Sequence, residues 1–220
     1  LLGKYVDDAG QVDYTRWHAS TADRTALRGY LRTLSRADLR TKSDARVRLA
    51  FWINAYNAVT VEGILREFPT TSIRNHTAKL WGYNIWDDLQ LYVGETAYSL
   101  NQIEHGILRK MGEPRIHFAI VCASKGCPRL FNEAYVPDQV DVQLDANARH
   151  FFAQHRNFHI RGNRVTLSSI LDWFGEDFGD SESAILRRIG NWLPDDKRKR
   201  LATIRPTVAF ADYDWSLNGK

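Results

Sequence analysis

The two cysteines of the chain, Cys122 and Cys127, are the side chains whose type and spacing most directly suggest chemistry. They follow the apolar run 116–121, and four residues separate them. Such a pair can supply a nucleophile or a redox couple, and a disulfide across this short loop is geometrically possible. A zinc site needs about four ligands and the sequence has no second cysteine pair, so we predict no metal.

Cys122 is predicted to end a short apolar strand over residues 115–121 and to precede the small residues Ala123 and Ser124. Small-residue loops at strand ends let backbone amides approach a ligand, and such loops often carry catalytic groups. The nearby Lys125 would favour the reactive thiolate. In the alternative interpretation, Cys122 is a buried and inert hydrophobic side chain.

Cys127 has a separate argument, because it directly precedes Pro128. Proline favours the first position of a helix, and a helix N-terminus lowers the pKa of a thiol placed there. The residues alone therefore leave the two cysteines tied as candidate nucleophiles.

A nucleophilic thiol needs a base, and Glu104-His105 lies within a predicted helix. Adjacent helical side chains point about 100° apart, so we expect His105 to meet the thiol while Glu104 approaches from the side. Alternatively, Glu104 satisfies buried donors elsewhere, or the pair is a surface carboxylate and a packed histidine. His117 is excluded as a partner of Cys122, because a strand rising roughly 3.3 Å per residue would separate them.

Asn54 and Asn57 stand three residues apart on a helix that is apolar nearly all round. Buried amides must be hydrogen-bonded, so most such residues tie a helix to a neighbouring loop. In the functional alternative, Asn54 holds a substrate carbonyl or orients a histidine.

The elements that must position these residues follow from hydrophobic periodicity and turn signals. The pattern predicts a single α+β domain over residues 1–220, with helices packed around a largely antiparallel sheet. Ser99 and Gln102 have capping-box spacing and should open the helix that carries Glu104. We expect helices at 21–34, 44–68, 102–111, 138–152 and 181–193, hairpins at 89–100 and 158–167, and a final strand at 207–213.

The formal net charge of +4 is mild and spread along the chain. Its one dense run, residues 195–200, is interpreted as a solvated helix start, and we predict no nucleic-acid partner. No apolar run approaches the roughly 18 residues of a membrane span. Because the chain begins at Leu1, not Met, we expect a truncated or processed N-terminus, and the missing leader is uninformative.

Three segments, 50–58, 103–109 and 117–124, resemble the domain-of-unknown-function family 547 (DUF547). The ending 213–218 resembles the C-terminal ending of that family and the opening 2–14 resembles its bacterial members, so the resemblance covers nearly the whole chain. It implies functional roles for Asn54, Glu104, His105 and Cys122. It breaks the tie in favour of Cys122, because Cys127 matches only bacterial members. It also implies a periplasmic or envelope location and a distant likeness to papain-like and transglutaminase-like cysteine enzymes.

These observations lead to the hypothesis of a thiol-dependent hydrolase or acyl-transfer enzyme, without a cofactor, acting on a small-molecule or peptide-like amide bond. In it, Cys122 is the nucleophile, His105 is the base, and Glu104 orients the histidine or stabilises its charge. The substrate carbonyl would be held by Asn54 and by the backbone amides of Ala123 and Ser124, and Cys127 would be a further substrate-binding residue. Two alternatives stay open: a binding or scaffold module with a buried polar network, and a thiol redox protein that uses both cysteines.

Overall fold

Helix α4 (Ala45–Glu67) is the central helix of the computed structural model, which describes residues 1–37, 44–77 and 83–220. Its first turn is capped by Asp44, whose side chain accepts the backbone N–H of Arg46. Most of its residues are buried, and they lie on every side of the helix. The predicted helix is therefore confirmed, and the all-round apolar pattern reflects burial between other elements.

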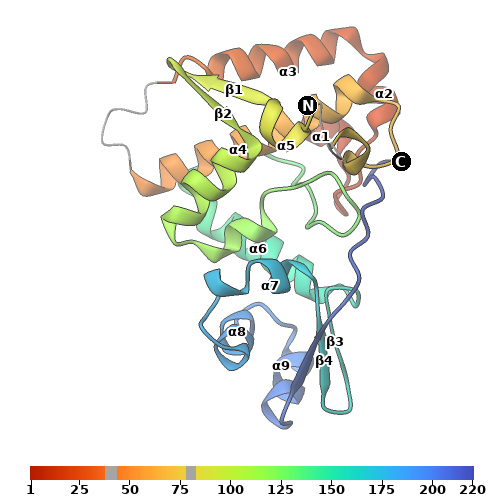
Figure 1. Cartoon of the computed structure of the whole chain (residues 1–220), viewed down its shortest axis with the longest axis vertical. Helices are drawn as coiled ribbons and strands as arrows, with labels where there is room; N and C mark the ends of the chain where they lie inside the picture. The colour runs from red at the N-terminus through yellow and green to blue at the C-terminus, as the bar shows by residue number, and fades with distance from the viewer. Residues whose placement is uncertain (38–43, 78–82) are drawn as a thin grey trace.

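The upper part of the molecule surrounds α4 with short helices and one hairpin (Figure 1). Strands β1 (Gln90–Val93) and β2 (Thr96–Ser99) pair antiparallel across the predicted turn, where Gly94 has a φ of 60°. The helices of this part are α1 (Leu2–Tyr5), α2 (Tyr14–Ala19), α3 (Thr21–Leu34), η1 (Ile73–His76) and α5 (Ile85–Asp88).

The helix after β2 opens with the predicted capping box. The Ser99 N–H donates to Oε1 of Gln102 at 2.9 Å, and the Gln102 N–H donates to Oγ of Ser99 at 3.2 Å. The helix begins as a π-helix, η2 (Gln102–Leu108), and ends as a 3₁₀ turn, η3 (Arg109–Met111). π-helical turns are rare and occur frequently at functional sites.

The strand predicted over residues 115–121 is wrong. The segment instead begins with the 3₁₀-helix η4 (Pro114–Phe118), which Glu113 caps and Pro114 starts. The rest of the segment is held by Asn57 of α4, whose amide donates to the Ala119 carbonyl at 2.9 Å and accepts the Val121 N–H at 3.0 Å. A short buried apolar run has no periodicity that distinguishes a strand from a buried turn, so the sequence pattern misled here.

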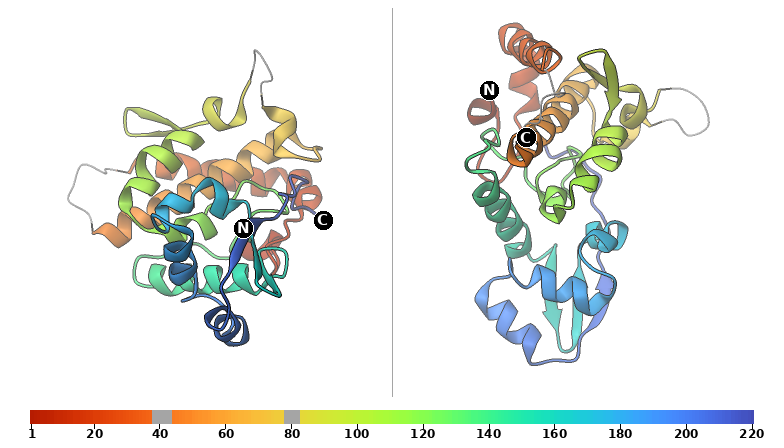
Figure 2. Two further views of the ribbon diagram at one scale, coloured as in Figure 1. Left: turned by 60° about the horizontal axis from the view of Figure 1, so that its bottom comes forward. Right: turned by 90° about the vertical axis from the view of Figure 1, so that its left-hand side faces the viewer.

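The lower part of the molecule contains the second hairpin and the C-terminal helices (Figure 2). Strand β3 (Phe158–Arg161) pairs antiparallel with β4 (Arg164–Leu167), which pairs parallel with β5 (Thr207–Phe210). The strands thus form two small sheets, with antiparallel pairing in two of the three ladders. The helices here are α6 (Val140–Ala153), α7 (Ile170–Trp173), η5 (Gly175–Asp177), α8 (Glu182–Ile189) and α9 (Asp195–Ala202).

Two groups of buried hydrophobic residues form the core, one around α4 and one between α6, the second sheet and α8. They meet at η4, because Ile116 belongs to the first group and Phe118 to the second. The chain accordingly folds as one α+β domain, as predicted. No helix within the described ranges is long and apolar enough to cross a membrane.

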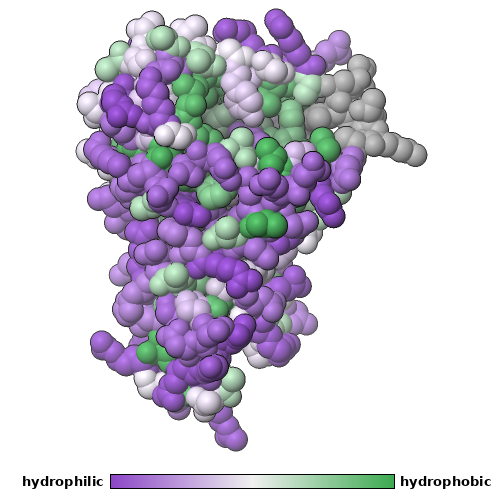
Figure 3. Space-filling view, turned by 180° about the vertical axis from the view of Figure 1, so that it is seen from behind, coloured by the Kyte–Doolittle hydropathy of each residue, from purple (hydrophilic) through white to green (hydrophobic). Residues whose placement is uncertain are grey.

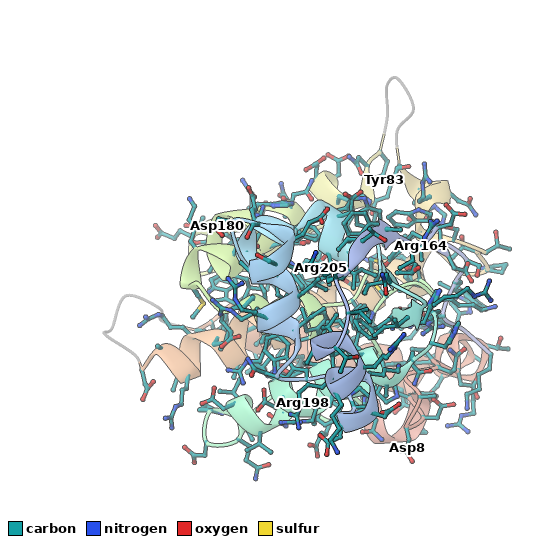
Figure 4. All side chains as sticks on the ribbon, turned by 90° about the horizontal axis from the view of Figure 1, so that it is seen from below. Asp8, Tyr83, Arg164, Asp180, Arg198 and Arg205 are labelled. Atoms are coloured by element: carbon teal, nitrogen blue, oxygen red, sulfur yellow. The ribbon has the colours of Figure 1, made fainter. Side chains whose placement is uncertain are left out.

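The face of the molecule that Figure 3 shows is mainly hydrophilic. Seen from behind, hydrophobic side chains gather mostly in the upper part (Figure 3). On the underside, Arg164, Asp180 and Arg198 present charges of both signs (Figure 4). The dense charge run is the exposed helix α9, with Asp195 and Asp196 in its first turn, as predicted.

The C-terminal segment returns from the lower part to the upper part of the molecule (Figure 1). There it pairs with the loop after Cys122: the Lys125 N–H donates to the Ser216 carbonyl at 2.8 Å, and the Asn218 N–H donates to the Ala123 carbonyl at 3.0 Å. Ser124 and Leu217 form an isolated antiparallel bridge between them. The two cysteines are thereby fixed against residues some 90 positions later in the chain.

Replacement of Asn57 by alanine should lower the free energy of unfolding by roughly 2–4 kcal/mol, because two buried backbone groups would lose their partners. Urea denaturation measures the change. Asn191→Ala is the matched control, because this exposed amide bonds only the Arg188 carbonyl and its loss should cost about 0.5 kcal/mol or less. Equal stability of the two variants would contradict the role assigned to Asn57.

Candidate active site

A pocket of about 220 Å³ lies beside both cysteines. Its lining combines Cys122 and Cys127 with residues from α4, η2, η4, α7 and the C-terminal segment. Four predicted site residues line it together: Cys122, Cys127, Glu104 and His105. Asn54, Ala123 and Ser124 do not line it.

The two cysteines are free and share hydrogen-bond partners. The backbone N–H of Cys122 donates to Sγ of Cys127 at 2.9 Å. The hydroxyl of Tyr213 lies 3.1 Å from Sγ of Cys122 and donates to Sγ of Cys127 at 3.2 Å. Oγ of Ser124 lies 3.0 Å from both Sγ of Cys122 and Oη of Tyr213. The result is one compact cluster of two sulfurs and two hydroxyls.

This cluster pushes the acidities of the two thiols apart. Burial raises the pKa of the Cys122 thiol well above its ordinary value, and its hydrogen bond to Cys127 raises it further. Burial alone would also raise the pKa of Cys127, but hydrogen bonds from the Cys122 thiol, the Tyr213 hydroxyl and the Cys122 N–H lower it to about 6. Because the two thiols share these hydrogen bonds, their titration belongs to the pair and not to either cysteine alone.

The loop that carries the cysteines is tightly constrained. Ala123 has a φ of 56°, a left-handed conformation that is uncommon for a residue with a side chain. The Tyr213 ring packs directly against Gly126, and a Cβ atom added to this glycine would lie 2.9 Å from the ring. Glycine at this position therefore lets the tyrosine reach the sulfurs.

Ala123 and Ser124 do not serve as predicted. Both residues are essentially inaccessible, with 0% and 1% of their surface exposed, and neither lines the pocket. The contribution of Ser124 is its hydroxyl, which bonds the Cys122 sulfur. The sequence indicates that the loop consists of small residues, but it does not indicate the direction in which the loop turns.

Glu104 occupies the pocket wall next to Tyr56, whose hydroxyl donates to Oε2 of Glu104 at 3.1 Å. Burial raises the pKa of the Glu104 carboxyl above its usual range, although the charge of His105 and the Tyr56 hydrogen bond oppose the shift. The carboxyl does not bond His105, so the predicted orienting contact is not formed. A buried carboxyl with a raised pKa suits a general acid or base.

His105 lines the same pocket but contacts neither sulfur by a hydrogen bond. Its Nδ1 lies 3.2 Å from Nη1 of Arg109, one helical turn later, and its ring tilts against Phe174 at 6.1 Å. The prediction brought His105 to the correct pocket. The hydrogen bond that would make it the base for Cys122 is absent among the described residues.

His117 was excluded as a partner of Cys122 on the basis of a strand that the structure replaces with η4, so the reason given was wrong, although His117 forms no hydrogen bond with Cys122 among the described residues. Its ring is buried and lines the pocket, stacked on Phe174 with centroids 4.3 Å apart. Nε2 of His117 lies 2.7 Å from Oδ2 of Asp177, which Arg109 also bonds at 2.6 Å and 2.9 Å through its Nε and Nη2. Burial lowers the pKa of His117 despite its bond to Asp177, so the neutral ring is favoured.

No sequence signal pointed to this histidine–aspartate pair. Asp177 lies 60 residues after His117, within the short turn η5, and only the contact between the two parts of the core brings them together. The two residues are a group that sequence reasoning missed.

Aromatic rings form much of the remaining wall. Tyr213 and Trp215 pack together at 4.5 Å, and both pack on Trp173 of α7, at 4.8 Å and 5.7 Å. The C-terminal segment therefore supplies both the hydroxyl that contacts the thiols and part of an apolar surface for a ligand.

Asn54 lies outside this pocket and has a structural contact. Its amide donates to the Tyr135 carbonyl at 2.8 Å and its oxygen accepts the Tyr135 N–H at 2.9 Å. Both polar ends are thus occupied by backbone, as in Asn57. The predicted role of Asn54 in holding a substrate is not supported, because its side chain does not line the pocket. The structural interpretation, also weighed from the sequence, accounts for its contacts.

The fold and the pocket define an α+β protein with a hydrogen-bonded thiol pair in an aromatic cleft. The chain belongs to the family described as "Protein of unknown function, DUF547", whose model matches residues 41–152. A search of curated proteins found no match, and neither did a search of solved structures. Among the described residues, no group of three or more His, Cys, Asp or Glu side chains could hold a metal ion.

The thiolate of the pair should titrate with a midpoint near pH 6, present above that pH and lost below it. Tyr213→Phe removes a hydroxyl donor to a charged sulfur and should raise the midpoint by about one to two pH units. The ultraviolet absorbance of the thiolate measures both values. Tyr92→Phe, at an exposed position, is the control. A midpoint that stays unchanged in Tyr213→Phe would contradict the assigned hydrogen bonds.

Proposed function

We propose that the protein is a thiol-dependent enzyme that transfers or hydrolyses an acyl group at an amide or peptide-like bond. The observation that supports this proposal is the hydrogen-bonded pair of free cysteines, Cys122 and Cys127, which lines a pocket together with the buried Glu104 carboxyl. A preformed thiolate together with a neutral acid is what cleavage of an amide requires.

In the proposed first step, the Cys122 sulfur attacks the carbonyl carbon while its proton passes to the Cys127 sulfur. The electron pair of the carbonyl moves to its oxygen. When the carbonyl reforms, the amine leaves and takes a proton from the Glu104 carboxyl, so that an acyl-thioester remains on Cys122. Cys122 is the attacking sulfur because it is the more exposed of the two.

In the second step, the Glu104 carboxylate takes a proton from water, and the oxygen of that water attacks the thioester. The Cys122 sulfur leaves and recovers its proton from Cys127. In this scheme Cys127 replaces His105 as the base for the nucleophile, because the cysteine and not the histidine contacts the Cys122 thiol. His105 and His117 are left as pocket residues that contact the substrate.

Acyl transfer can be tested without the natural substrate, using an activated ester such as a p-nitrophenyl acyl ester. The wild-type protein should gain one acyl group on the peptide that contains Cys122, detected by mass spectrometry, and Cys122→Ala should gain none. Glu104→Gln should still acylate, because p-nitrophenolate leaves without an acid, but its deacylation should slow by roughly 10²- to 10³-fold.

Glu95→Gln, an exposed carboxyl in the β1–β2 turn, is the matched control and should deacylate like the wild type. Acylation that persists at another residue in Cys122→Ala, or deacylation unaffected by Glu104→Gln, would contradict the proposed roles.

A second candidate function is thiol–disulfide exchange, favoured by the hydrogen bond between the two free thiols. Here one thiolate would attack a substrate disulfide and release one thiol. The other cysteine would then displace the second thiol and close the Cys122–Cys127 bridge. The periplasmic or envelope location implied by the sequence resemblance would suit such chemistry, since oxidising compartments maintain disulfides.

Thiol counting after treatment with oxidised glutathione separates the two candidates. Exchange predicts that both thiols disappear together without retained glutathione, and that Cys127→Ser instead stops at a mixed disulfide on Cys122. The acyl-transfer proposal predicts instead that the ester test above succeeds and that no rapid internal bridge forms. A glutathione adduct that persists in the wild-type protein would argue against exchange.

A further inference from the structure

His117 has one ring nitrogen with a protein partner and one without. Its Nε2 lies 2.7 Å from Oδ2 of Asp177, and among the described residues its Nδ1 has no hydrogen-bond partner. Only 1% of the side chain is exposed. In the described part of the chain, the side-chain polar atoms that have neither a partner nor any exposure belong to Trp17, Arg24 and Glu62, so the exposed part of the His117 ring includes Nδ1. Because His117 lines the thiol pocket, this nitrogen opens into that pocket.

Asp177 determines which nitrogen of the ring carries the proton. Although burial alone would raise it, the pKa of the Asp177 carboxyl is lowered by hydrogen bonds from Arg109 and His117, so the group is a carboxylate at neutral pH. A carboxylate only accepts hydrogen bonds, so Nε2 of His117 must be the protonated nitrogen. Burial lowers the pKa of the His117 ring, which keeps the ring neutral and leaves Nδ1 as an unprotonated acceptor.

Neighbouring groups fix both the position and the plane of this ring. Arg109 holds Asp177 with two hydrogen bonds, of 2.6 Å and 2.9 Å. Phe174 stacks on the imidazole at 4.3 Å with an interplanar angle of 19°, and Phe178 packs on it at 5.9 Å. The charges of Arg109 and His105 also disfavour a second proton on the ring. A fixed acceptor of this kind selects ligands that carry a matching donor.

The other polar groups of the pocket donate their protons elsewhere. The Tyr56 hydroxyl donates to Glu104 at 3.1 Å, and the Tyr213 hydroxyl donates to a cysteine sulfur at 3.2 Å. The Asn101 amide donates to Asp87 at 2.6 Å. Among the described residues that line the pocket, none is a lysine or an arginine. The donor that matches Nδ1 therefore comes with a bound molecule.

We propose that Nδ1 of His117 accepts the N–H of the substrate amide, so that the enzyme selects secondary amides, the class to which peptide bonds belong, over esters and tertiary amides. This inference rests on the proposed acyl transfer and names its substrate class. Cys122 would face the carbonyl carbon of the amide, and His117, which lines the same pocket, would face its nitrogen. An ester places an oxygen where the N–H should be and leaves Nδ1 unsatisfied. His117 is then a specificity-determining residue, and Asp177 is a positioning residue that fixes its tautomer.

The probes are two small thiol reagents that differ only in this group, N-propyl-2-chloroacetamide and propyl chloroacetate. The rate at which each alkylates Cys122 is measured by mass spectrometry and divided by its rate with free N-acetylcysteine, which removes the difference in intrinsic reactivity. On this scale the wild-type protein should favour the amide by roughly tenfold, the effect of one hydrogen bond to a buried acceptor. His117→Phe keeps a ring against Phe174 and should lose the preference. Asp177→Asn lets either nitrogen carry the proton and should reduce the preference to about threefold or less.

His155→Phe makes the same replacement at an exposed position and should keep the preference of the wild type. Nitrogen-15 NMR of the free protein is an independent measurement, which keeps the test decisive if His117→Phe does not fold. It should show a protonated Nε2 and an unprotonated Nδ1 in His117.

The inference is overturned if the wild-type protein treats both reagents equally, if His117→Phe keeps the preference, or if the proton lies on Nδ1. Because alkylation requires no acyl transfer, each of these results overturns this inference alone. Failure of the p-nitrophenyl ester test, with the preference for the amide retained, overturns the proposed acyl transfer instead. A Cys122 thiol that reacts with neither reagent contradicts both.

Discussion

The pairing of the cysteine loop with the C-terminal segment is the interaction on which the site depends. Backbone hydrogen bonds join Lys125 to Ser216, Gly126 to Asp214, and Asn218 to Ala123. They fix the loop in a conformation that includes the left-handed Ala123 and place the Tyr213 hydroxyl against both sulfurs. Without this pairing, the thiols would have neither their hydrogen-bond donor nor the aromatic wall of the pocket.

Burial then determines the chemistry of the groups that the loop brings together. In a low-dielectric surrounding, each ionisable group avoids charge unless donors stabilise it. Cys127 receives such donors and has a lowered pKa, whereas Cys122 and Glu104 receive too few and have raised ones. The donors that Cys127 receives and Cys122 lacks thus shift the pKa values of the two thiols in opposite directions within one small space. Opposed acidities of this kind are typical of sites that transfer protons.

Helix α4 connects the parts of the molecule by using different faces for different tasks. Tyr56 contacts Glu104 in the thiol pocket, while Asn54 and Asn57 bond the backbone of two separate loops. The loop bonded by Asn57 leads directly into Cys122, and the loop bonded by Asn54 forms a wall of a second cavity. A helix apolar nearly all round can carry these polar residues because each one is satisfied by a fixed partner.

The sequence by itself determined the local elements and the main chemical groups. Capping at Ser99, the glycine turns of both hairpins and the periodicity of α4 depend on neighbouring residues, so they could be predicted. The placement of Glu104, His105 and the two cysteines at one pocket was also predicted. That prediction was based on the family motifs, which occur in the expected order along the chain.

The partners of these groups depended on the tertiary structure. His117 pairs with Asp177 and Tyr213 bonds both thiols across 60 to 91 residues, and the apolar run before Cys122 turns instead of forming a strand because Asn57 satisfies its backbone. Sequence patterns report the preferences of a segment for burial and turning. Which hydrogen-bond partner meets a buried group is decided only when distant segments pack, since packing sets both the contact and the pKa that follows from it.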